Sequence, residues 1–164
     1  MVKKGLLFFI LQVNVTLIAS GQNLNLDKYD VSIYDSLISK SEFIKNGKSL
    51  DSSRLKQLTF NPIVDGIRKV YYLNGKLHSE GEIKNQKEEG FWIYWHENGT
   101  KAREGSFKNG KREGTHKYWY PNGTIRGEGN FKGDQYDGKW TMYKEDGSEV
   151  VEQYYKGGQL VKKE

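Results

Sequence analysis

The feature that most constrains this chain is a 24-residue sequence period that runs from Gly66 to Gly158. Turn-forming, acidic, basic and aromatic residues each recur four times in one register. The glycines that follow Asn or Asp are Gly75, Gly99, Gly123 and Gly147. The columns of large side chains are Tyr71, Trp95, Trp119 and Tyr143, and Ile83, Phe107, Phe131 and Tyr155. Such self-similarity predicts a tandem array of small units that pack on their neighbours.

Each repeat is predicted to fold as one β-hairpin. In the second repeat an aromatic-rich strand over 91–96 leads into Asn98-Gly99, and a return strand follows over 101–108. Asn-Gly between strands favours a type I′ turn, in which both central residues have positive φ. The segment 109–114 is then a longer loop into the next hairpin. All four repeats carry Asn-Gly or Asp-Gly at this point, so one hairpin type should recur.

The predicted fold class is therefore all-β, an elongated single sheet or solenoid of stacked hairpins. The repeats occupy 66–89, 90–113, 114–137 and 138–164. Because a lone hairpin is barely stable in water, the repeats must bury side chains against one another. We expect Trp95 to contact Tyr71 and Trp119. We expect Phe107 to form a second ladder with the equivalent residues of the adjacent repeats.

Glycines also recur inside the predicted return strand, at Gly81, Gly105 and Gly129. Glycine within a strand marks a bulge or a close backbone approach. The fourth repeat has Gln153 at this position. The substitution indicates an end unit that no longer admits a neighbour.

Residues 22–65 do not share the 24-residue register and are predicted to cap the first repeat. One interpretation is a short amphipathic helix over 29–44 that ends at Asn46-Gly47. The other is that 44–48 is a decayed copy of 107–111, and the sequence leaves both open. The polar segment 49–57 is predicted to be a linker or a short helix.

The first 21 residues have the plan of a secretory signal peptide. Lys3 and Lys4 precede an apolar run over 5–11, and 19–21 supply small residues for cleavage. A membrane span needs about 20 apolar residues, and Gln12 interrupts this run early. We therefore expect export to a periplasm or out of the cell, with no transmembrane span in the mature form.

Composition narrows the class of protein further. A mean hydropathy of −0.81 argues against a thick layered core, whereas 13% aromatic residues and 19 glycines suit short strands with many turns. The absence of cysteine excludes disulfides and thiol chemistry. The formal net charge of +5 falls to +3 without Lys3 and Lys4. Because acids and lysines are interleaved, the clustered basic face of nucleic-acid-binding proteins is not predicted.

No catalytic, cofactor-binding or metal site is predicted. His78, His96 and His116 share no metal-ligand spacing and are interpreted as surface or ladder histidines. The columns that contain Glu104 and Lys108 are interpreted as a solvated or cross-paired charged face. The alternative is a repetitive lattice that faces a ligand.

The pattern Gly-x-Trp-x-x-Tyr/Trp-x-x-Asn-Gly-x-x-x-x-Glu-Gly-x-Phe-Lys-Asn-Gly resembles the MORN repeat in its variant form. Residues 90–110 carry it almost completely, whereas Arg68 and His116 replace the first tryptophan in two other copies. The resemblance implies a sheet of hairpins used for protein contact, or for lipid contact in other members, without enzyme activity. Bacterial proteins of this kind are often labelled antitoxin-like, which fits poorly with a signal peptide.

Two functional hypotheses follow. The first is a non-enzymatic exported scaffold that binds an unknown protein partner in the cell envelope or outside the cell. The second is a module that binds glycan or cell wall, with aromatic rings that stack on sugars or grip choline-like groups. The candidate binding surface comprises Trp92, Tyr94, Trp95, Tyr118, Trp119 and Trp140. Buried aromatic rings favour the scaffold, and tryptophans in exposed grooves favour the glycan module.

Overall fold

The computed structural model describes residues 29–33, 36–46, 50–56 and 58–163, so the predicted signal peptide at 1–21 lies outside the described residues. Contacts divide the chain into two compact units. The first combines the described residues up to Ile63 with Val70–Gly75, and the second combines Val64–Lys69 with the described residues from Lys76 onward. In the described part of the chain, no helix has the length and apolar character needed to cross a membrane.

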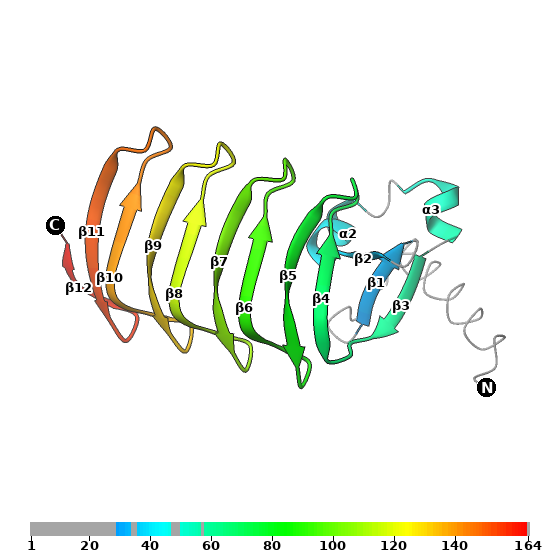
Figure 1. The fold of residues 1–164 in the computed structure, drawn as a ribbon, viewed down its shortest axis with the longest axis horizontal. Coiled ribbons are helices and arrows are strands. Elements are labelled where there is room, and N and C mark those ends of the chain that lie inside the picture. The colour runs from blue at the N-terminus through cyan, green and yellow to red at the C-terminus, as the bar shows by residue number, and fades with distance from the viewer. Residues whose placement is uncertain (1–28, 34–35, 47–49, 57, 164) are drawn as a thin grey trace. The chain divides into compact units, whose positions relative to one another are not determined.

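The second unit is a single open sheet of successive hairpins, which confirms the predicted all-β array (Figure 1). Its strands follow chain order, and each pairs antiparallel with the next from β5 to β12. The strands are β4 (Gly66–Tyr71), whose last two residues belong to the first unit, β5 (Leu77–Lys84), β6 (Lys87–Trp95), β7 (Lys101–Lys108), β8 (Lys111–Trp119), β9 (Ile125–Lys132), β10 (Gln135–Tyr143), β11 (Glu149–Lys156) and β12 (Gln159–Lys163).

The tightest turns lie at the opposite end of the hairpins from the end predicted. The longer loop expected over 109–114 is wrong, because Lys108 of β7 pairs directly with Lys111 of β8. Asn109 and Gly110 both have positive φ, 53° and 79°, as a two-residue type I′ turn requires. The same turn recurs at 85–86, 133–134 and 157–158.

The Asn98-Gly99 turn is not of type I′, so that prediction is also wrong. Of these two residues only Gly99 has positive φ, at 96°. The Gly99 amide donates to the carbonyl of His96 at 2.8 Å, and the His96 amide donates to that of Thr100 at 2.8 Å. This is a type I turn followed by a left-handed glycine. The Asn98 carboxamide oxygen accepts from the Thr100 amide at 3.0 Å and so stabilises the alternative turn.

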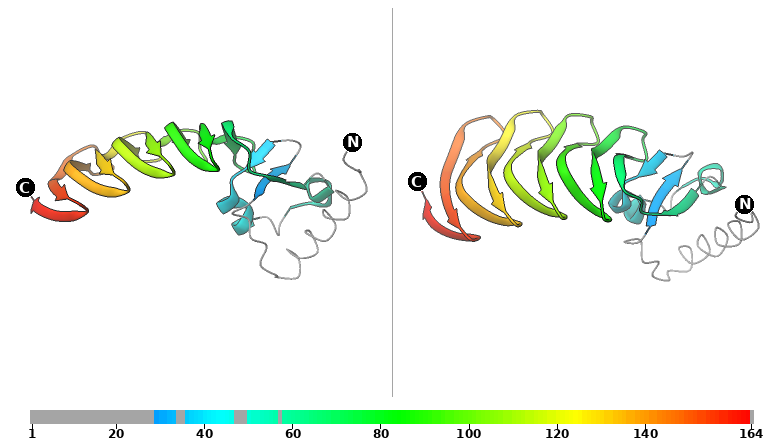
Figure 2. Two further views of the ribbon diagram at one scale, coloured as in Figure 1. Left: turned by 90° about the horizontal axis from the view of Figure 1, so that it is seen from below. Right: turned by 60° about the horizontal axis from the view of Figure 1, so that its bottom comes forward.

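A second set of glycines produces a register shift in each hairpin. Gly90, Gly114 and Gly138 have φ of 67°, 70° and 71°, and strand pairing shifts next to each of them. An extra residue in one strand bends it and increases its twist. The strands of the second unit are visibly bent along their length (Figure 2).

The acidic residue before this glycine links one hairpin to the next. Glu89 accepts a hydrogen bond from the Asn109 amide at 2.8 Å, and Glu113 accepts one from the Gly133 amide at 2.9 Å. Asp65 does the same for the amide of Asn85 at 2.8 Å. In the first three repeats the acidic column therefore ties the hairpin start to the following tight turn.

The buried ladder consists of two interleaved columns. The predicted column contains Ile83, Phe107 and Phe131, and a second column, which was not predicted, contains Trp92, His116 and Trp140. His116 lies between Phe107 and Phe131, with ring centroids 5.4 and 5.1 Å away, and Trp140 lies 5.0 Å beyond Phe131. Direct stacking of equivalent residues is therefore wrong. Each repeat contributes two strands, so equivalent residues are roughly 10 Å apart and the intervening strand fills the gap.

The same spacing separates Trp95 from Trp119. The intervening strand β7 places Lys101 opposite Trp95, and the Lys101 Nζ lies 5.0 Å from the ring centroid of Trp119. Both tryptophans are half-buried. The ladder expected through Trp95 is therefore wrong, because Lys101 lies opposite Trp95 and Ile125 lies opposite Trp119.

A shared hydrogen bond explains how His116 takes the place of tryptophan in the second column. Trp92 donates its ring N–H to the carbonyl of Glu82 at 3.1 Å, and Trp140 donates to that of Asn130 at 2.9 Å. His116 makes the equivalent bond, from Nε2 to the carbonyl of Ser106 at 2.8 Å. Because a carbonyl only accepts hydrogen bonds, Nε2 carries the proton. His116 thus keeps the donor of the tryptophan in a smaller ring, as the ladder-histidine interpretation predicted.

Of the two alternatives predicted for the recurrent strand glycines, a bulge or a close approach, the structure shows the close approach. A Cβ at Gly81 would overlap the indole of Trp92, and one at Gly129 would overlap that of Trp140. At Gly105 the overlap would be with the ring of His116. Each ring of the second column therefore lies flat across the glycine of the preceding strand. Gln153, the departure in the fourth repeat, pairs with Lys163 of β12, so the prediction that this unit admits no neighbour is wrong.

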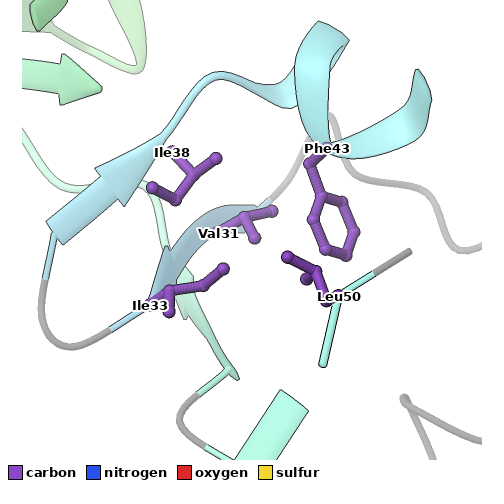
Figure 3. Close-up of a cluster of buried hydrophobic side chains, with 5 residues drawn as sticks. All are labelled: Val31, Ile33, Ile38, Phe43 and Leu50. Carbon is purple, nitrogen blue, oxygen red and sulfur yellow. The ribbon is translucent and has the colours of Figure 1, made fainter. Parts of the chain in front are cut away.

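The first unit has its own small core (Figure 3). It contains β1 (Tyr29–Ile33), β2 (Ser36–Ile38), α2 (Lys40–Asn46), α3 (Ser52–Lys56) and β3 (Leu58–Pro62). β1 pairs antiparallel with β2 and β3, and β2 pairs parallel with Val70 and Tyr71. The core side chains are Val31, Ile33, Ile38, Phe43 and Leu50.

This arrangement corrects the helix predicted over 29–44. Residues 29–33 and 36–38 are strands, and only 40–46 are helical. Val31 and Ile33 lie two residues apart in β1 and are both buried, which is the spacing of one strand face and not of one helix face. The short helix predicted within 49–57 is present as α3.

Candidate functional site

The sheet of the second unit has two chemically different faces. We call the face that carries Trp92, Phe107, His116, Phe131 and Trp140 the ladder face, and the other the outer face. Side chains alternate between faces along a strand, so Phe91, Ile93 and Trp95 of β6 lie on the outer face. The six predicted surface residues are thereby separated. Trp92, Tyr94, Tyr118 and Trp140 belong to the ladder face, and Trp95 and Trp119 belong to the outer face.

Burial divides the six residues further. Trp92 and Trp140 are each only 3% exposed, and Tyr94 is also buried. Tyr118, Trp95 and Trp119 are half-buried. The buried indoles already donate their N–H groups to backbone carbonyls. Trp92 and Trp140 therefore hold the repeats together, and the accessible candidates are Tyr118, Trp95 and Trp119.

Arginines cover the rings of the ladder face, and the sequence reasoning missed them. The guanidinium carbon of Arg103 lies 3.7 Å from the ring centroid of Tyr94, and that of Arg112 lies 3.9 Å from that of Phe131. Arg126 lies 5.5 Å from the ring centroid of Tyr118. These distances are typical of cation–π contacts. The arginines do not recur at the 24-residue spacing, so the column pattern carried no signal for them.

Two acids orient polar groups on the ladder face. The Tyr94 hydroxyl donates to Glu88, and burial together with this carboxylate raises the pKa of Tyr94. The Arg112 Nε donates to Asp134 at 2.9 Å, and this bond holds the pKa of Asp134 below its usual range. The Arg112 side chain is therefore held by Asp134 of the tight turn at 133–134.

The outer face combines exposed apolar residues with paired charges. Phe91 is 55% exposed and Ile67, its equivalent in β4, is 75% exposed. Lys117 pairs with Glu128 at 3.0 Å, and Lys101 pairs with Glu104 at 2.7 Å. Glu80 and Glu152 also pair with lysines, Lys69 and Lys139. The structure thus matches the cross-paired interpretation of the glutamate column.

The Asn-Gly-Thr sequences at 98–100 and 122–124 match the pattern for N-glycosylation, but their asparagine side chains are hydrogen-bonded within the turns. The Asn98 amide nitrogen donates to the carbonyl of Pro121 at 2.7 Å, and that of Asn122 donates to the carbonyl of Glu145 at 3.1 Å. These bonds connect each turn to the next one. Among the described residues, no group of three or more His, Cys, Asp or Glu side chains is arranged to hold a metal ion.

The repeats match a known family model. Residues 64–85, 88–109 and 112–132 match the model described as MORN repeat variant, in three tandem copies whose starts are 24 residues apart. The fourth hairpin, built from β10 and β11, lies outside the matched segments. Repeats of this type are binding modules for proteins or membranes and are not typically enzymatic. No curated protein sequence matches the chain significantly.

Proposed function

We propose that this protein is an exported, non-catalytic scaffold that binds a partner protein through the outer face of its middle repeats. The observation that carries the proposal is the exposure of Phe91 at 55% on the face that also holds the half-buried Trp95 and Trp119. Large exposed apolar side chains amid polar ones are typical of protein interfaces. Aromatic residues are also the usual anchors of such interfaces.

Charge on the outer face supports a protein partner. Lys117 and Glu128, and Lys101 and Glu104, are already paired on this surface. Exposed pairs of this kind contribute little to stability, about 0.2–1 kcal/mol each. They form a polar surround for the aromatic anchors, as the rim of an interface does.

The glycan alternative has weaker support. Two of the four tryptophans, Trp92 and Trp140, are buried and present no ring face to a sugar. The ring of Trp119 already faces the ammonium group of Lys101 at 5.0 Å. A choline-like cation would have to displace that ammonium group before it could contact the ring.

The proposed binding is tested by affinity capture from envelope extract with immobilised mature chain, 22–164, followed by titration of the purified partner. We expect the wild type to bind and Phe91→Ser to bind at least tenfold more weakly, since an interface anchor contributes about 1–2 kcal/mol or more. Leu160→Ser is the matched control, because it removes a side chain of similar exposure, 51%, from β12. The double variant Trp95→Ala/Trp119→Ala extends the test to the half-buried anchors.

Wild-type affinity in both Phe91→Ser and the double variant contradicts this location of the interface. A saturable change in tryptophan fluorescence on titration with choline or wall fragments, without a protein partner, supports the glycan alternative instead. Export is tested separately by the mass of the mature protein recovered from fractionated cells. Retention of residues 1–21 in that protein contradicts cleavage after Gly21.

A further inference from the structure

The repeat pattern has one local gap on the ladder face, in β9. The two ladder-face positions of the return strands are Ser79 and Gly81 in β5, and Arg103 and Gly105 in β7. In β9 both are glycine, Gly127 and Gly129. Trp140 covers Gly129, whereas Gly127 offers no side chain at the position that Arg103 takes in β7, and from β9 the Arg126 guanidinium lies 5.5 Å from the Tyr118 ring centroid.

A hollow of about 250 Å³ lies at this gap. It is lined by Arg112, Tyr118, Arg126, Tyr136, Trp140 and Met142, together with the backbone of Gly127. Tyr118 pairs with Gly127 on one side, and Met142 pairs with it on the other. Gly127 adds no side chain between these two large neighbours, and a Cβ there would lie 3.0 Å from the carbonyl oxygen of Thr141. A hollow of this volume suits a ligand smaller than the drug-sized molecules that fill typical pockets.

The lining combines two guanidinium groups with apolar walls. Arg112 is held in place by Asp134, through Nε at 2.9 Å, and lies over Phe131. Arg126 is exposed and lies 5.5 Å from the Tyr118 ring centroid. None of the six lining side chains is acidic, and Asp134 balances only one of the two positive charges. The hollow thus offers one net positive charge beside aromatic and thioether surface.

The equivalent location in the preceding repeat is closed and has one positive and one negative side chain in place of the two arginines. Arg103 fills the position of Gly127 and lies 3.7 Å over the Tyr94 ring. Glu88 stands where Arg112 stands, and it accepts a hydrogen bond from the Tyr94 hydroxyl. Ala102 stands where Arg126 stands. The hollow at β8–β10 is therefore not repeated in the preceding repeat and does not follow from the repeat pattern.

We propose that this hollow binds an apolar carboxylate, such as an aromatic carboxylic acid or the carboxyl-terminal residue of a peptide with a large apolar side chain. Arginine pairs with carboxylates through two parallel hydrogen bonds. The apolar body of the ligand would lie against Tyr136, Trp140 and Met142, of which Tyr136 and Met142 are 38% and 40% exposed. The site is on the ladder face, so it goes beyond the proposed function and does not depend on the outer-face partner.

The test uses the purified full-chain product and N-acetylphenylalanine as the probe, with N-acetylphenylalanine amide as its neutral counterpart. Tryptophan fluorescence reports binding through Trp140, and calorimetry gives the affinity. We expect the acid to bind at least about tenfold more tightly than the amide, the loss typical of one charge-assisted hydrogen bond. We expect Arg126→Gln to remove this preference while its melting temperature stays near that of the wild type, because Arg126 is exposed.

Lys108→Gln is the matched control, because it removes the same charge at an exposed position outside the hollow. It should bind the acid with wild-type affinity. Equal binding of acid and amide, unchanged affinity in Arg126→Gln, or no saturable binding of the acid at millimolar concentration each overturns the proposal. A phenylalanine-terminated peptide and its amidated form distinguish the two sources of carboxylate. Tighter binding of the free-carboxylate peptide than of the acetylated amino acid indicates a protein carboxyl terminus, and weaker binding indicates a small acid.

Discussion

At the scale of single residues, replacing a return-strand glycine by alanine should destabilise this protein, although the same change usually stabilises a strand. Alanine in the middle of a strand is normally more favourable than glycine by roughly 0.5–1 kcal/mol. At Gly105 a Cβ would overlap the ring of His116. We expect Gly105→Ala to lower the free energy of unfolding by about 1–3 kcal/mol, because overpacking outweighs the gain in chain entropy. Urea denaturation of both proteins measures the difference.

The double variant Gly105→Ala/His116→Ala is the control for this prediction. Removal of the ring removes the overlap, so the two substitutions should not be additive. The double variant should lose less stability than the sum of the single variants. Strict additivity would show that the cost at Gly105 has another cause.

The buried His116 predicts a pH dependence of stability. Burial lowers the pKa of His116, as do the nearby guanidinium groups of Arg112 and Arg103, whereas its hydrogen bond to Ser106 and the carboxylate of Asp134 oppose the shift. Burial and Arg103 also lower the pKa of His78. An unfolded histidine takes up its proton near the ordinary value of 6.5, before the folded one does. The unfolded state therefore binds more protons below that pH, and stability falls as pH falls.

We expect the free energy of unfolding to decrease from about pH 7 to about pH 5, by at most about 1.4 kcal/mol per pH unit for each histidine. The acids with lowered pKa, Asp65, Asp134 and Asp146, start from an ordinary value of 3.8, and their contribution is lost only below that pH. His116→Trp restores the residue type of the column and should reduce the slope. An unchanged slope in this variant would assign the pH dependence to other groups.

At the scale of elements, one carboxylate connects the hairpins in each of the first three repeats. Glu113 precedes the bulge glycine Gly114 and accepts a hydrogen bond from the amide of Gly133 at 2.9 Å. We expect Glu113→Ala to lower the melting temperature, at a cost of about 1–2 kcal/mol, because the charge-assisted bond is lost. Hydrogen exchange at the Gly133 amide should become faster.

Glu145→Ala is the matched control for this prediction. Only the backbone carbonyl of Glu145 accepts the turn-to-turn bonds, from Asn122 at 3.1 Å and Thr124 at 3.0 Å. Loss of its exposed carboxylate should leave the melting temperature within experimental error. Equal effects of the two substitutions would contradict a specific role for the acidic column.

The elements also show where local sequence signals are ambiguous. Asn-Gly occurs at both ends of the second hairpin, at 98–99 and at 109–110. The dipeptide predicts a turn at each place, but not which turn has two residues. The local bonds from the amide and hydroxyl of Thr100 to the Asn98 side-chain oxygen stabilise one type of turn at 98–99, and Asp146 and Ser148 make the same bonds in the last hairpin. The dipeptide alone does not contain this signal, because it depends on the residue after the glycine.

At the scale of the whole second unit, the stability of the sheet is distributed along the ladder of buried rings. Trp140 touches Phe131 and Tyr136, and so connects the third and fourth repeats. We expect Trp140→Ala to cost about 3–5 kcal/mol, as large-to-small substitutions in a core do. Trp119→Ala should cost less, because Trp119 is half-buried on the outer face.

Hydrogen exchange separates a local from a propagated effect of Trp140→Ala. In an array whose repeats contact only their neighbours, loss of protection should be greatest in β9–β11 and should decrease toward β5. A uniform loss along β5–β11 would show that the unit unfolds in one step. A loss confined to β10 would contradict the contribution of the ladder to cohesion.

The sequence by itself determined the repeat, its period and the hairpin as its unit, and it singled out Gly81, Gly105 and Gly129 without deciding between a bulge and a close approach. These features repeat three or four times, so a weak local signal becomes strong by recurrence. Tertiary structure alone decided which column is buried, which end carries the tight turn, and where Arg103, Arg112 and Arg126 lie. The physical reason is that a second strand lies between two equivalent residues. Each ring therefore contacts a ring of the other column and not its own equivalent in the next repeat. The hollow at Gly127 arises where one repeat departs from the others, and only the neighbouring strands reveal what that departure exposes.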